Sequence, residues 1–321
     1  MNLFESPEIL MEAINNTGYI IDKQFATVLY ISYVLEKPLL ISVPPGTGKS
    51  QIALTLSALL NDNDPIRLQC YDGITADEAM YSYNYKKQLL YMEATKDKAD
   101  WKEISNDIYS EDFLSYRPLL KSIMSDHKEV LLIDELDKTD EEFEAFLLEF
   151  LNDYQISIPE VGTVKAKNKP LTILTSNDMR DLTDALRRRC CFYYIDYPDT
   201  EKETRIIMAA VPSINDLLAT QITKFVQILR EEKSLKKVPS ISESIDWARI
   251  LIKMGVVKLD KEIATDTLNV LLKYQDDIQY TKSAIDDIMK EMPSKAMKIE
   301  HQQIRSTDTN KLLNNKGNWD F

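Results

Sequence analysis

The stretch Leu39-Leu40-Ile41-Ser42-Val43-Pro44-Pro45-Gly46-Thr47-Gly48-Lys49-Ser50 decides the fold. Its first five residues are an apolar run of strand length, and apolar side chains recur at helical spacing after Ser50. A strand, a glycine-containing turn and a helix in this order open a parallel α/β unit. The chain has only 7 glycines, and two of them lie in this one turn.

The turn carries most of the P-loop pattern. Its glycines let successive backbone N–H groups and the helix N-terminus face phosphates. We expect Lys49 to reach the β and γ phosphates of ATP, and the Ser50 hydroxyl to bind Mg²⁺. Val43 stands where the pattern has its first glycine, so the entry to the turn departs from it. The predicted nucleotide-binding residues are Pro45, Gly46, Thr47, Gly48, Lys49, Ser50 and Gln51.

A second run, Val130-Leu131-Leu132-Ile133, ends in the two acids Asp134 and Glu135. Ligands of open α/β sheets bind at the carboxyl ends of the strands. Asp134 is then placed to hold Mg²⁺ through water, and Glu135 to orient and polarise the attacking water. Taken alone, the run could equally be a buried strand that ends in surface acids. The P-loop upstream favours the catalytic interpretation.

Three further apolar runs have strand length, at Ile66–Cys70, Leu171–Ser176 and Cys191–Ile195. Because these runs are continuous rather than alternating, we expect the strands to be buried on both faces of a sheet. Between the strands lie helical patterns, one of them opened by a Thr-x-x-Glu capping box at Thr139–Glu142. The sequence therefore predicts an α/β core with a five-stranded parallel sheet.

The character of the chain changes after Pro198. Capping boxes at Thr200–Glu203 and Ser240–Glu243 open helical patterns, and no strand-like run competes before about residue 292. A chain of 321 residues is also long enough for two domains of roughly 150 residues. We predict a nucleotide-binding core at 1–198, a small all-α domain at 199–292, and a mobile polar tail at 293–321.

Composition excludes several classes of protein. The formal charge is 39 − 52 = −13, which provides no basic footprint for nucleic acid or an anionic membrane. With 3 cysteines and 2 histidines, neither a disulfide framework nor a Cys/His zinc site is suggested. No apolar run approaches the ~20 residues of a membrane span, and the first residues do not resemble a signal peptide. We expect a cytoplasmic protein.

Two conspicuous clusters are interpreted conservatively. Nine acidic residues fall between Asp134 and Asp153, and apart from the first two we expect most of them on a solvated helix face. Five tyrosines fall between Tyr71 and Tyr91, where base stacking would need a positively charged groove that the sequence does not provide. Core packing or subunit contact is the favoured interpretation of the tyrosines.

With these motifs in place, the chain resembles an AAA+ ATPase. Asp-Glu after the third strand is typical of that class, and Leu171–Asn177 is similar to its sensor-1 strand. The resemblance implies that Asn177 contacts the γ-phosphate and the water. The segment Leu182–Cys190 resembles the helix that carries the arginine finger. By this resemblance Arg189, and next Arg188, would act on the nucleotide of a neighbouring subunit.

The resemblance narrows to the MoxR family. It covers approximately residues 15–255 and rests on three stretches: Leu68–Gly73 with Tyr85–Leu90, Phe143–Ile158, and Arg187–Cys190 with Asp196–Pro198. In this family the core carries an insertion, here at 73–92, and a hairpin before sensor 1, here at 155–166. The family's lid arginine is missing from the matching stretch Pro239–Glu243. Arg249, further along the same helix, is the candidate to replace it at the nucleotide.

The resemblance implies an AAA+ ring, expected to be a hexamer, with ATP and Mg²⁺ at each subunit interface. MoxR-like proteins are thought to remodel or activate a partner, commonly one with a von Willebrand factor A domain. Two other functions stay open. One is a motor stimulated by nucleic acid, which the charge disfavours. The other is a nucleotide-binding switch with negligible hydrolysis, which Val43 and the missing lid arginine allow.

Overall fold

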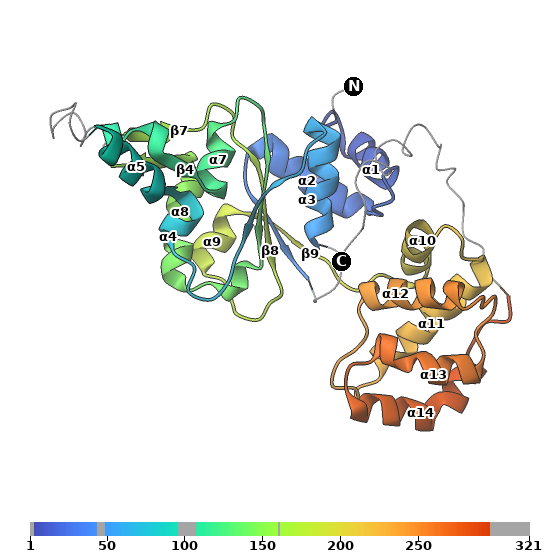
Figure 1. Ribbon diagram of the computed structural model, residues 1–321. Coiled ribbons are helices and arrows are strands. Elements are labelled where there is room, and N and C mark those ends of the chain that lie inside the picture. Colours follow the sequence, from blue (N-terminus) through green and yellow to red (C-terminus); the bar gives the residue numbers. More distant parts are fainter. Residues whose placement is uncertain (1–2, 44–48, 96–106, 160, 296–321) are drawn as a thin grey trace. The chain divides into compact units, whose positions relative to one another are not determined.

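The computed structural model describes residues 3–43, 49–95, 107–159 and 161–295 (Figure 1). These residues form two compact units, which are described separately. The first contains residues 3–7, 23–43 and 52–194, and the second contains residues 8–22, 49–51 and 195–295, within the described ranges.

The first unit is built on a five-stranded parallel sheet of order β2-β5-β8-β1-β9 (Figure 1). All five strands were predicted from the apolar runs, and the α/β fold with a parallel sheet followed by helices is confirmed. The strands are β1 (Leu39–Ser42), β2 (Ile66–Gln69), β5 (Val130–Asp134), β8 (Leu171–Ser176) and β9 (Cys191–Tyr194).

Burial differs between the middle and the edges of the sheet. Every residue of β1, β5 and β8 is buried, as expected for strands covered on both faces. The same expectation is wrong for the two edge strands. In β2 buried and exposed residues alternate, and in β9 half-buried and exposed residues alternate. One face of each edge strand is therefore open, and polar residues occupy it in β2.

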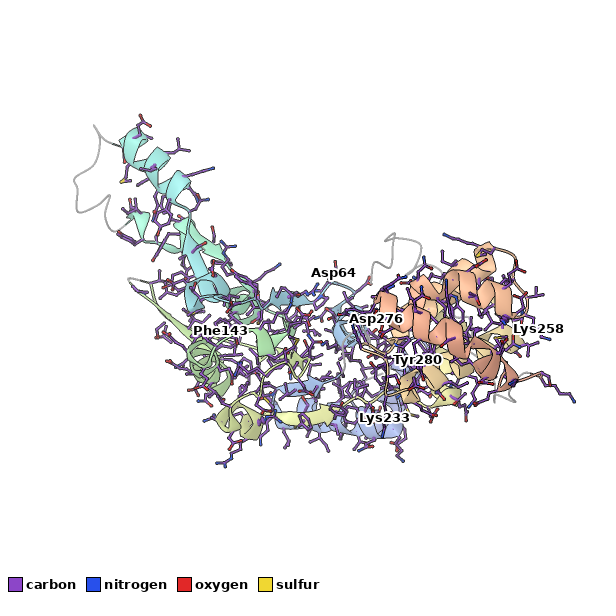
Figure 2. All side chains as sticks on the ribbon, turned by 90° about the horizontal axis from the view of Figure 1, so that it is seen from below. Asp64, Phe143, Lys233, Lys258, Asp276 and Tyr280 are labelled. Atoms are coloured by element: carbon purple, nitrogen blue, oxygen red, sulfur yellow. The ribbon has the colours of Figure 1, made fainter. Side chains whose placement is uncertain are left out.

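Helices cover both faces of the sheet (Figure 1). Helices α2 and α3 lie on one side, and α7, α8 and α9 on the other. The second group shares a core with alternate strand residues such as Leu40, Ile133 and Leu174. Phe143 of α8 lies in this core (Figure 2). The bounds are α2 (Lys23–Leu35), α3 (Lys49–Asn61), α7 (Pro118–Met124), α8 (Glu141–Asp153) and α9 (Asp184–Arg189).

The predicted capping box at Thr139 is wrong by one residue. Asp140 is the N-cap of α8, and its carboxylate accepts a hydrogen bond from the Phe143 N–H. Thr139 instead ends a short 3₁₀ turn, η2 (Leu136–Lys138), and its hydroxyl donates to the Leu136 carbonyl. Both Asp and Thr are good caps, so the motif alone did not fix which of the two begins the helix.

Two small antiparallel sheets extend the first unit. One pairs β3 (Tyr81–Tyr83) with β4 (Leu114–Tyr116), in a segment that also holds α4 (Ala76–Met80), α5 (Tyr85–Thr95) and the 3₁₀ turn η1 (Glu111–Phe113). This segment lies between β2 and α7 in the chain. The other pairs β6 (Gln155–Ile158) with β7 (Gly162–Lys165), ahead of β8.

Every element that the structure describes after β9 is a helix, and these helices belong to the second unit. Their shared core includes Trp247, which is fully buried and donates from its indole N–H to the Thr267 hydroxyl at 2.7 Å. They are α10 (Thr200–Ala210), α11 (Asp216–Glu231), α12 (Ile241–Lys253), α13 (Lys261–Leu271) and α14 (Gln275–Lys290). Helix α1 (Pro7–Asn15) belongs mainly to the same unit.

The two predicted caps of this unit had different outcomes. Ser240 forms the expected capping box with Glu243 at the start of α12. At α10 the N-cap is Asp199, whose side chain accepts from the Lys202 N–H, so the box predicted at Thr200 is wrong.

Most of the predicted polar tail lies outside the described residues. Among the described helices, none is long and apolar enough to cross a membrane.

Candidate nucleotide-binding site

The predicted phosphate-binding turn is flanked as the motif requires. Strand β1 ends at Ser42, and α3 begins at Lys49, so Lys49, Ser50 and Gln51 form the first turn of that helix. Lys49 is 7% exposed. Pro45, Gly46, Thr47 and Gly48 lie outside the described residues. The order of strand, turn and helix was predicted from the sequence, and the bounds of β1 and α3 agree with it.

Asp134 ends β5 with its carboxylate almost completely buried, at 2% exposure. One carboxylate oxygen accepts from the Arg67 guanidinium at 2.6 Å, and the other accepts from the Thr175 hydroxyl. Arg67 comes from β2 and Thr175 from β8, the two neighbours of β5 in the sheet. A buried carboxylate is costly unless it is paired, and these two groups satisfy it.

Glu135 follows in a left-handed backbone conformation, with φ 57° and ψ 49°. Its N–H donates to the Thr175 hydroxyl oxygen at 2.9 Å, which fixes the turn that follows β5. Few non-glycine residues adopt this conformation, and such residues cluster at functional sites. After this turn the Glu135 carboxylate lies within hydrogen-bond distance of Gln69, the last residue of β2, and of Asn177, directly after β8.

Three side chains hold the Glu135 carboxylate. Lys138 Nζ lies at 2.6 Å, Gln69 Nε2 at 2.9 Å and Asn177 Nδ2 at 3.3 Å from its oxygens. Gln69 also accepts a hydrogen bond from Arg67, so it links the groups around the two acids. The structure thus brings Asp134, Glu135 and Asn177 together at one edge of the sheet.

Electrostatics keep the Glu135 carboxylate charged. The hydrogen bond from Lys138 is the largest influence and lowers the pKa of Glu135, with Asn177 contributing in the same direction. Partial burial and the nearby Asp134 charge act against them. Cys70 lies in the same surroundings, where burial together with the acids raises the pKa of its thiol to about 12. The site therefore contains an ionised carboxylate, whose pKa is lowered, and a thiol that stays protonated.

Arg188 and Arg189 lie at the end of α9, and both side chains are exposed. The start of this helix is fixed by Glu144, a fully buried residue of α8. The Glu144 carboxylate accepts from the Thr183 N–H at 2.9 Å and from the Thr183 hydroxyl at 2.8 Å, and it also pairs with Arg180. Thr183 is in turn the N-cap of α9.

The buried position of Glu144 corrects part of the expectation for the acidic run. Asp137 is likewise buried, at 4% exposure, and accepts from the Met179 N–H. Most other acids of the run, including Glu141 and Glu142, are exposed as expected. The run thus contains structural carboxylates that composition alone does not distinguish from solvated ones.

Sequence reasoning missed the partners of the two acids, Arg67, Gln69, Lys138 and Thr175. A signal for two of them was present, because Arg67 and Gln69 alternate with apolar residues in β2 and so share one face.

Arg249, the proposed lid residue, lies on α12 of the second unit. Its guanidinium forms an ion pair with Asp246 at 3.4 Å, one turn earlier in the same helix.

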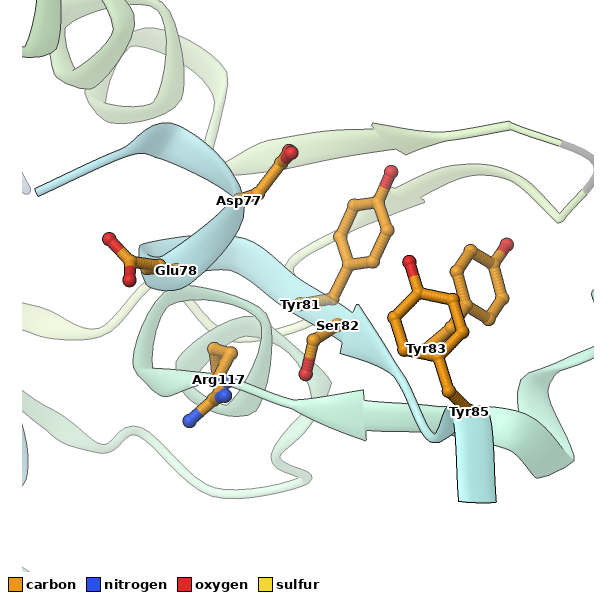
Figure 3. Close-up of a pocket in the computed structure, with 7 residues that line it drawn as sticks. All are labelled: Asp77, Glu78, Tyr81, Ser82, Tyr83, Tyr85 and Arg117. Carbon is orange, nitrogen blue, oxygen red and sulfur yellow. The ribbon is translucent and has the colours of Figure 1, made fainter. Parts of the chain in front are cut away.

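A pocket of about 260 Å³ lies on the segment between β2 and α7 (Figure 3). The rings of Tyr81, Tyr83 and Tyr85 line it, and their hydroxyls point to the same side as the Asp77 carboxylate. Tyr81 and Tyr83 also meet edge to face, with ring centroids 6.0 Å apart. With two acids and one arginine in its lining, the pocket is not the positive groove that base stacking requires.

Comparison with known proteins adds to this geometry. Residues 38–190 match the family model described as AAA domain, dynein-related subfamily. Residues 38–190 thus have the fold of an AAA domain. This range contains the P-loop turn, both acids after β5, Asn177, and the arginines of α9. No curated protein gives a sequence match to the chain.

Several solved structures resemble the chain weakly. The Holliday junction branch migration motor RuvB of Thermotoga maritima is 15% identical with a TM-score of 0.46, over 89% of this chain and 80% of that one. A proposed ATPase from Cytophaga hutchinsonii is 16% identical with a TM-score of 0.43, over 89% of this chain and 95% of that one.

The arrangement around the AAA domain's two acids suits nucleotide chemistry. Mg²⁺ is usually held by one or two carboxylates together with the phosphates of its substrate. Within the described residues, no group of three or more His, Cys, Asp or Glu side chains could hold a metal by itself. A single buried carboxylate, Asp134, beside a charged Glu135 meets the requirement for a metal shared with a nucleotide.

Proposed function

We propose that the chain is a MoxR-like AAA+ ATPase that binds and hydrolyses ATP with Mg²⁺ at the subunit interfaces of a ring. The observation that carries the proposal is the cluster of Glu135, Asp134 and Asn177 at the carboxyl ends of β5 and β8. In a domain with a P-loop, a charged carboxylate at this edge serves to position the attacking water.

In the proposed mechanism, Lys49 and the N–H groups of the P-loop bind the phosphates, and Ser50 and Asp134 hold the metal. Mg²⁺, when bound, would neutralise charge on the phosphate oxygens. Glu135 orients a water molecule and draws on its proton, because its lowered pKa keeps it ionised. Asn177, which donates a hydrogen bond to Glu135, would contact that water and the γ-phosphate.

The ring and its trans-acting arginines are supported by the exposure of Arg188 and Arg189. Neither guanidinium makes a hydrogen bond or an ion pair with another described residue, so both are available to a neighbouring subunit. Their helix is nevertheless firmly held at its start by the buried Glu144. A fixed helix with exposed terminal arginines is the arrangement that an arginine finger needs.

The use of ATP belongs to the same proposal. Nucleotide-driven motion of such a ring would remodel or activate a partner protein, of the class that contains a von Willebrand factor A domain. The support is the resemblance of Leu68–Gly73, Phe143–Ile158 and Arg187–Cys190 to MoxR proteins. The β3–β4 segment and the β6–β7 hairpin, both additions to the parallel sheet, are consistent with it.

The central test replaces Glu135 by Gln. Glu135→Gln keeps the shape and most hydrogen bonds but cannot take a proton, so ATP binding should persist while turnover falls by about 10²-fold or more. The matched control is Glu142→Gln on the exposed face of α8, which should change neither. Equal loss of binding and turnover in Glu135→Gln would mean that the residue does not act on the water.

A second test addresses the ring. Specific ATPase activity should rise with protein concentration if neighbouring subunits complete each site. Mixing inactive Arg189→Ala and Lys49→Ala subunits should restore part of the activity, because each supplies what the other lacks. Failure of this rescue would contradict a trans-acting Arg189. Stimulation of ATP hydrolysis by DNA or RNA would instead favour a nucleic-acid motor.

A further inference from the structure

The Asp134 carboxylate forms an ion pair with a side chain of the protein itself, Arg67. Arg67 Nη2 lies 2.6 Å from Asp134 Oδ2, while the Thr175 hydroxyl donates to the other oxygen. Asp134 is 2% exposed, and the Arg67 side chain is 53% exposed. The acid is therefore buried and fixed, whereas its cationic partner reaches it from the solvent side of the edge strand β2.

This pairing has a clear origin in the fold. Gln69 is in register with Asp134 across the parallel pair of β2 and β5, and Arg67 lies two residues earlier on the same face. A long arginine side chain can therefore lie along the strand and reach the carboxylate at the strand end. The register thus gives the buried carboxylate a charged partner, which offsets part of the cost of its burial.

We infer that Arg67 is a stand-in cation that neutralises Asp134 in the nucleotide-free protein and competes with Mg²⁺ for this carboxylate. The inference rests on the proposed function, since that function assigns the metal to Asp134. Both cations need the same buried acid. Because more than half of the Arg67 side chain is already in contact with water, its guanidinium can leave Asp134 without being buried elsewhere.

Competition of this kind has a measurable consequence. The apparent affinity for the metal is reduced by the fraction of molecules in which Asp134 is free of Arg67. A partly exposed, charge-assisted pair is of modest strength, so removing Arg67 should lower the Mg²⁺ concentration needed by about fivefold. Binding of nucleotide without metal should be much less affected, because Asp134 is not expected to contact the phosphates directly.

The experiment measures binding of a fluorescent, non-hydrolysable ATP analogue, mant-AMPPNP, to the full-length protein as free Mg²⁺ is varied. Arg67→Met removes the charge and keeps the length of the side chain, whereas Arg67→Lys keeps the charge. The matched control is Arg117→Met in the same unit, since the Arg117 guanidinium makes no hydrogen bond or ion pair with a described residue. Circular dichroism checks that each variant is folded.

Half-maximal Mg²⁺ should be about fivefold lower for Arg67→Met than for the wild type, with Arg67→Lys and Arg117→Met close to the wild type. An unchanged or higher Mg²⁺ requirement in Arg67→Met would overturn the inference while leaving the proposed function intact. If the wild type binds no analogue at any Mg²⁺ concentration, the proposed function fails and the inference fails with it. Should Arg67→Met not fold, Arg67→Gln carries the same expectation.

Discussion

Each unit of the molecule contains a buried carboxylate paired with an arginine, and the two pairs differ in how much of the cation is enclosed. In the second unit Glu203 is 0% exposed and Arg230 only 8%. Arg230 binds both carboxylate oxygens, at 2.6 and 2.9 Å, and the Ser244 hydroxyl adds a third hydrogen bond at 2.9 Å. In the first unit Asp134 is equally buried, but Arg67 is 53% exposed.

The surroundings of the two arginines explain the difference. Arg230 also donates to the Pro239 carbonyl at 2.8 Å and lies over the Tyr197 ring at 4.4 Å, so its whole guanidinium is used. The enclosed Arg230 side chain cannot leave Glu203 without breaking these contacts. Arg67 shares its guanidinium between Asp134 and Gln69 on the open face of an edge strand. The same chemistry thus serves as a permanent link in one unit and as an exchangeable contact in the other.

The largest effect is expected for the enclosed pair. Arg230→Met leaves Glu203 buried without its charge partner, which typically costs about 3–5 kcal/mol. Urea denaturation followed by circular dichroism should show a correspondingly lower midpoint for the second unit's helices. If the variant is as stable as the wild type, then the Glu203–Arg230 pair does not hold the helices together, and the contrast between the two units loses its basis.

Arg67→Met should be much milder, at about 1 kcal/mol, because solvent can reach the position that the guanidinium leaves. The measurement is the same denaturation experiment in metal-free buffer. A loss as large as that of Arg230→Met would show that Arg67 is a structural anchor rather than an exchangeable partner. Added Mg²⁺ and nucleotide should restore stability to this variant by mass action.

The fold and the two acids could be predicted because their signals are local. An apolar run that enters a glycine turn predicts β1 and α3, and a run that ends in Asp134-Glu135 predicts their position at the edge of the sheet. The strand before Asn177 follows from the apolar run Leu171–Ser176, whereas the role of Asn177 was implied only by the resemblance to the sensor-1 strand. Parallel strands gather their carboxyl ends at one edge, so residues distant in sequence could be expected to meet.

The partners of the acids could not be predicted, because strand register decides them. Arg67 reaches Asp134 only because β2 pairs with β5 so that Gln69 stands opposite Asp134. Nothing in the sequence near Glu144 says that its carboxylate caps a segment about forty residues later. The misplaced caps at Thr139 and Thr200 have a different cause, since in each case an aspartate lies next to the threonine and caps the helix instead.

A smaller effect is expected for Lys138, the cationic partner of Glu135. Its hydrogen bond lowers the pKa of Glu135, so Lys138→Ala should raise that pKa toward its ordinary value. Because the native pKa lies below the unfolded one, the pair stabilises the protein above that unfolded value and loses this contribution as pH falls through the native pKa. Carboxyl ¹³C NMR titration of Glu135 measures the shift directly.

The control for this titration is Lys121→Ala, an exposed lysine of α7. It should leave the pKa of Glu135 unchanged. An unchanged pKa in Lys138→Ala as well would mean that Gln69 and Asn177 alone keep the carboxylate ionised. In that event the contrast between the two units would rest on Arg67 and Arg230 alone.

The smallest effect is expected at a pair that is exposed on both sides. Lys236 and Asp276 lie 2.6 Å apart, but their side chains are 58% and 75% exposed, and Asp276 stands on the surface of α14 (Figure 2). Water screens such a pair, so Lys236→Ala should leave the denaturation midpoint unchanged within error. A clear loss of stability would show that distance, rather than enclosure, sets the strength of these ion pairs. The ranking of Arg230, Arg67 and Lys236 would then have no physical basis, since all three cations lie 2.6 Å from their acids.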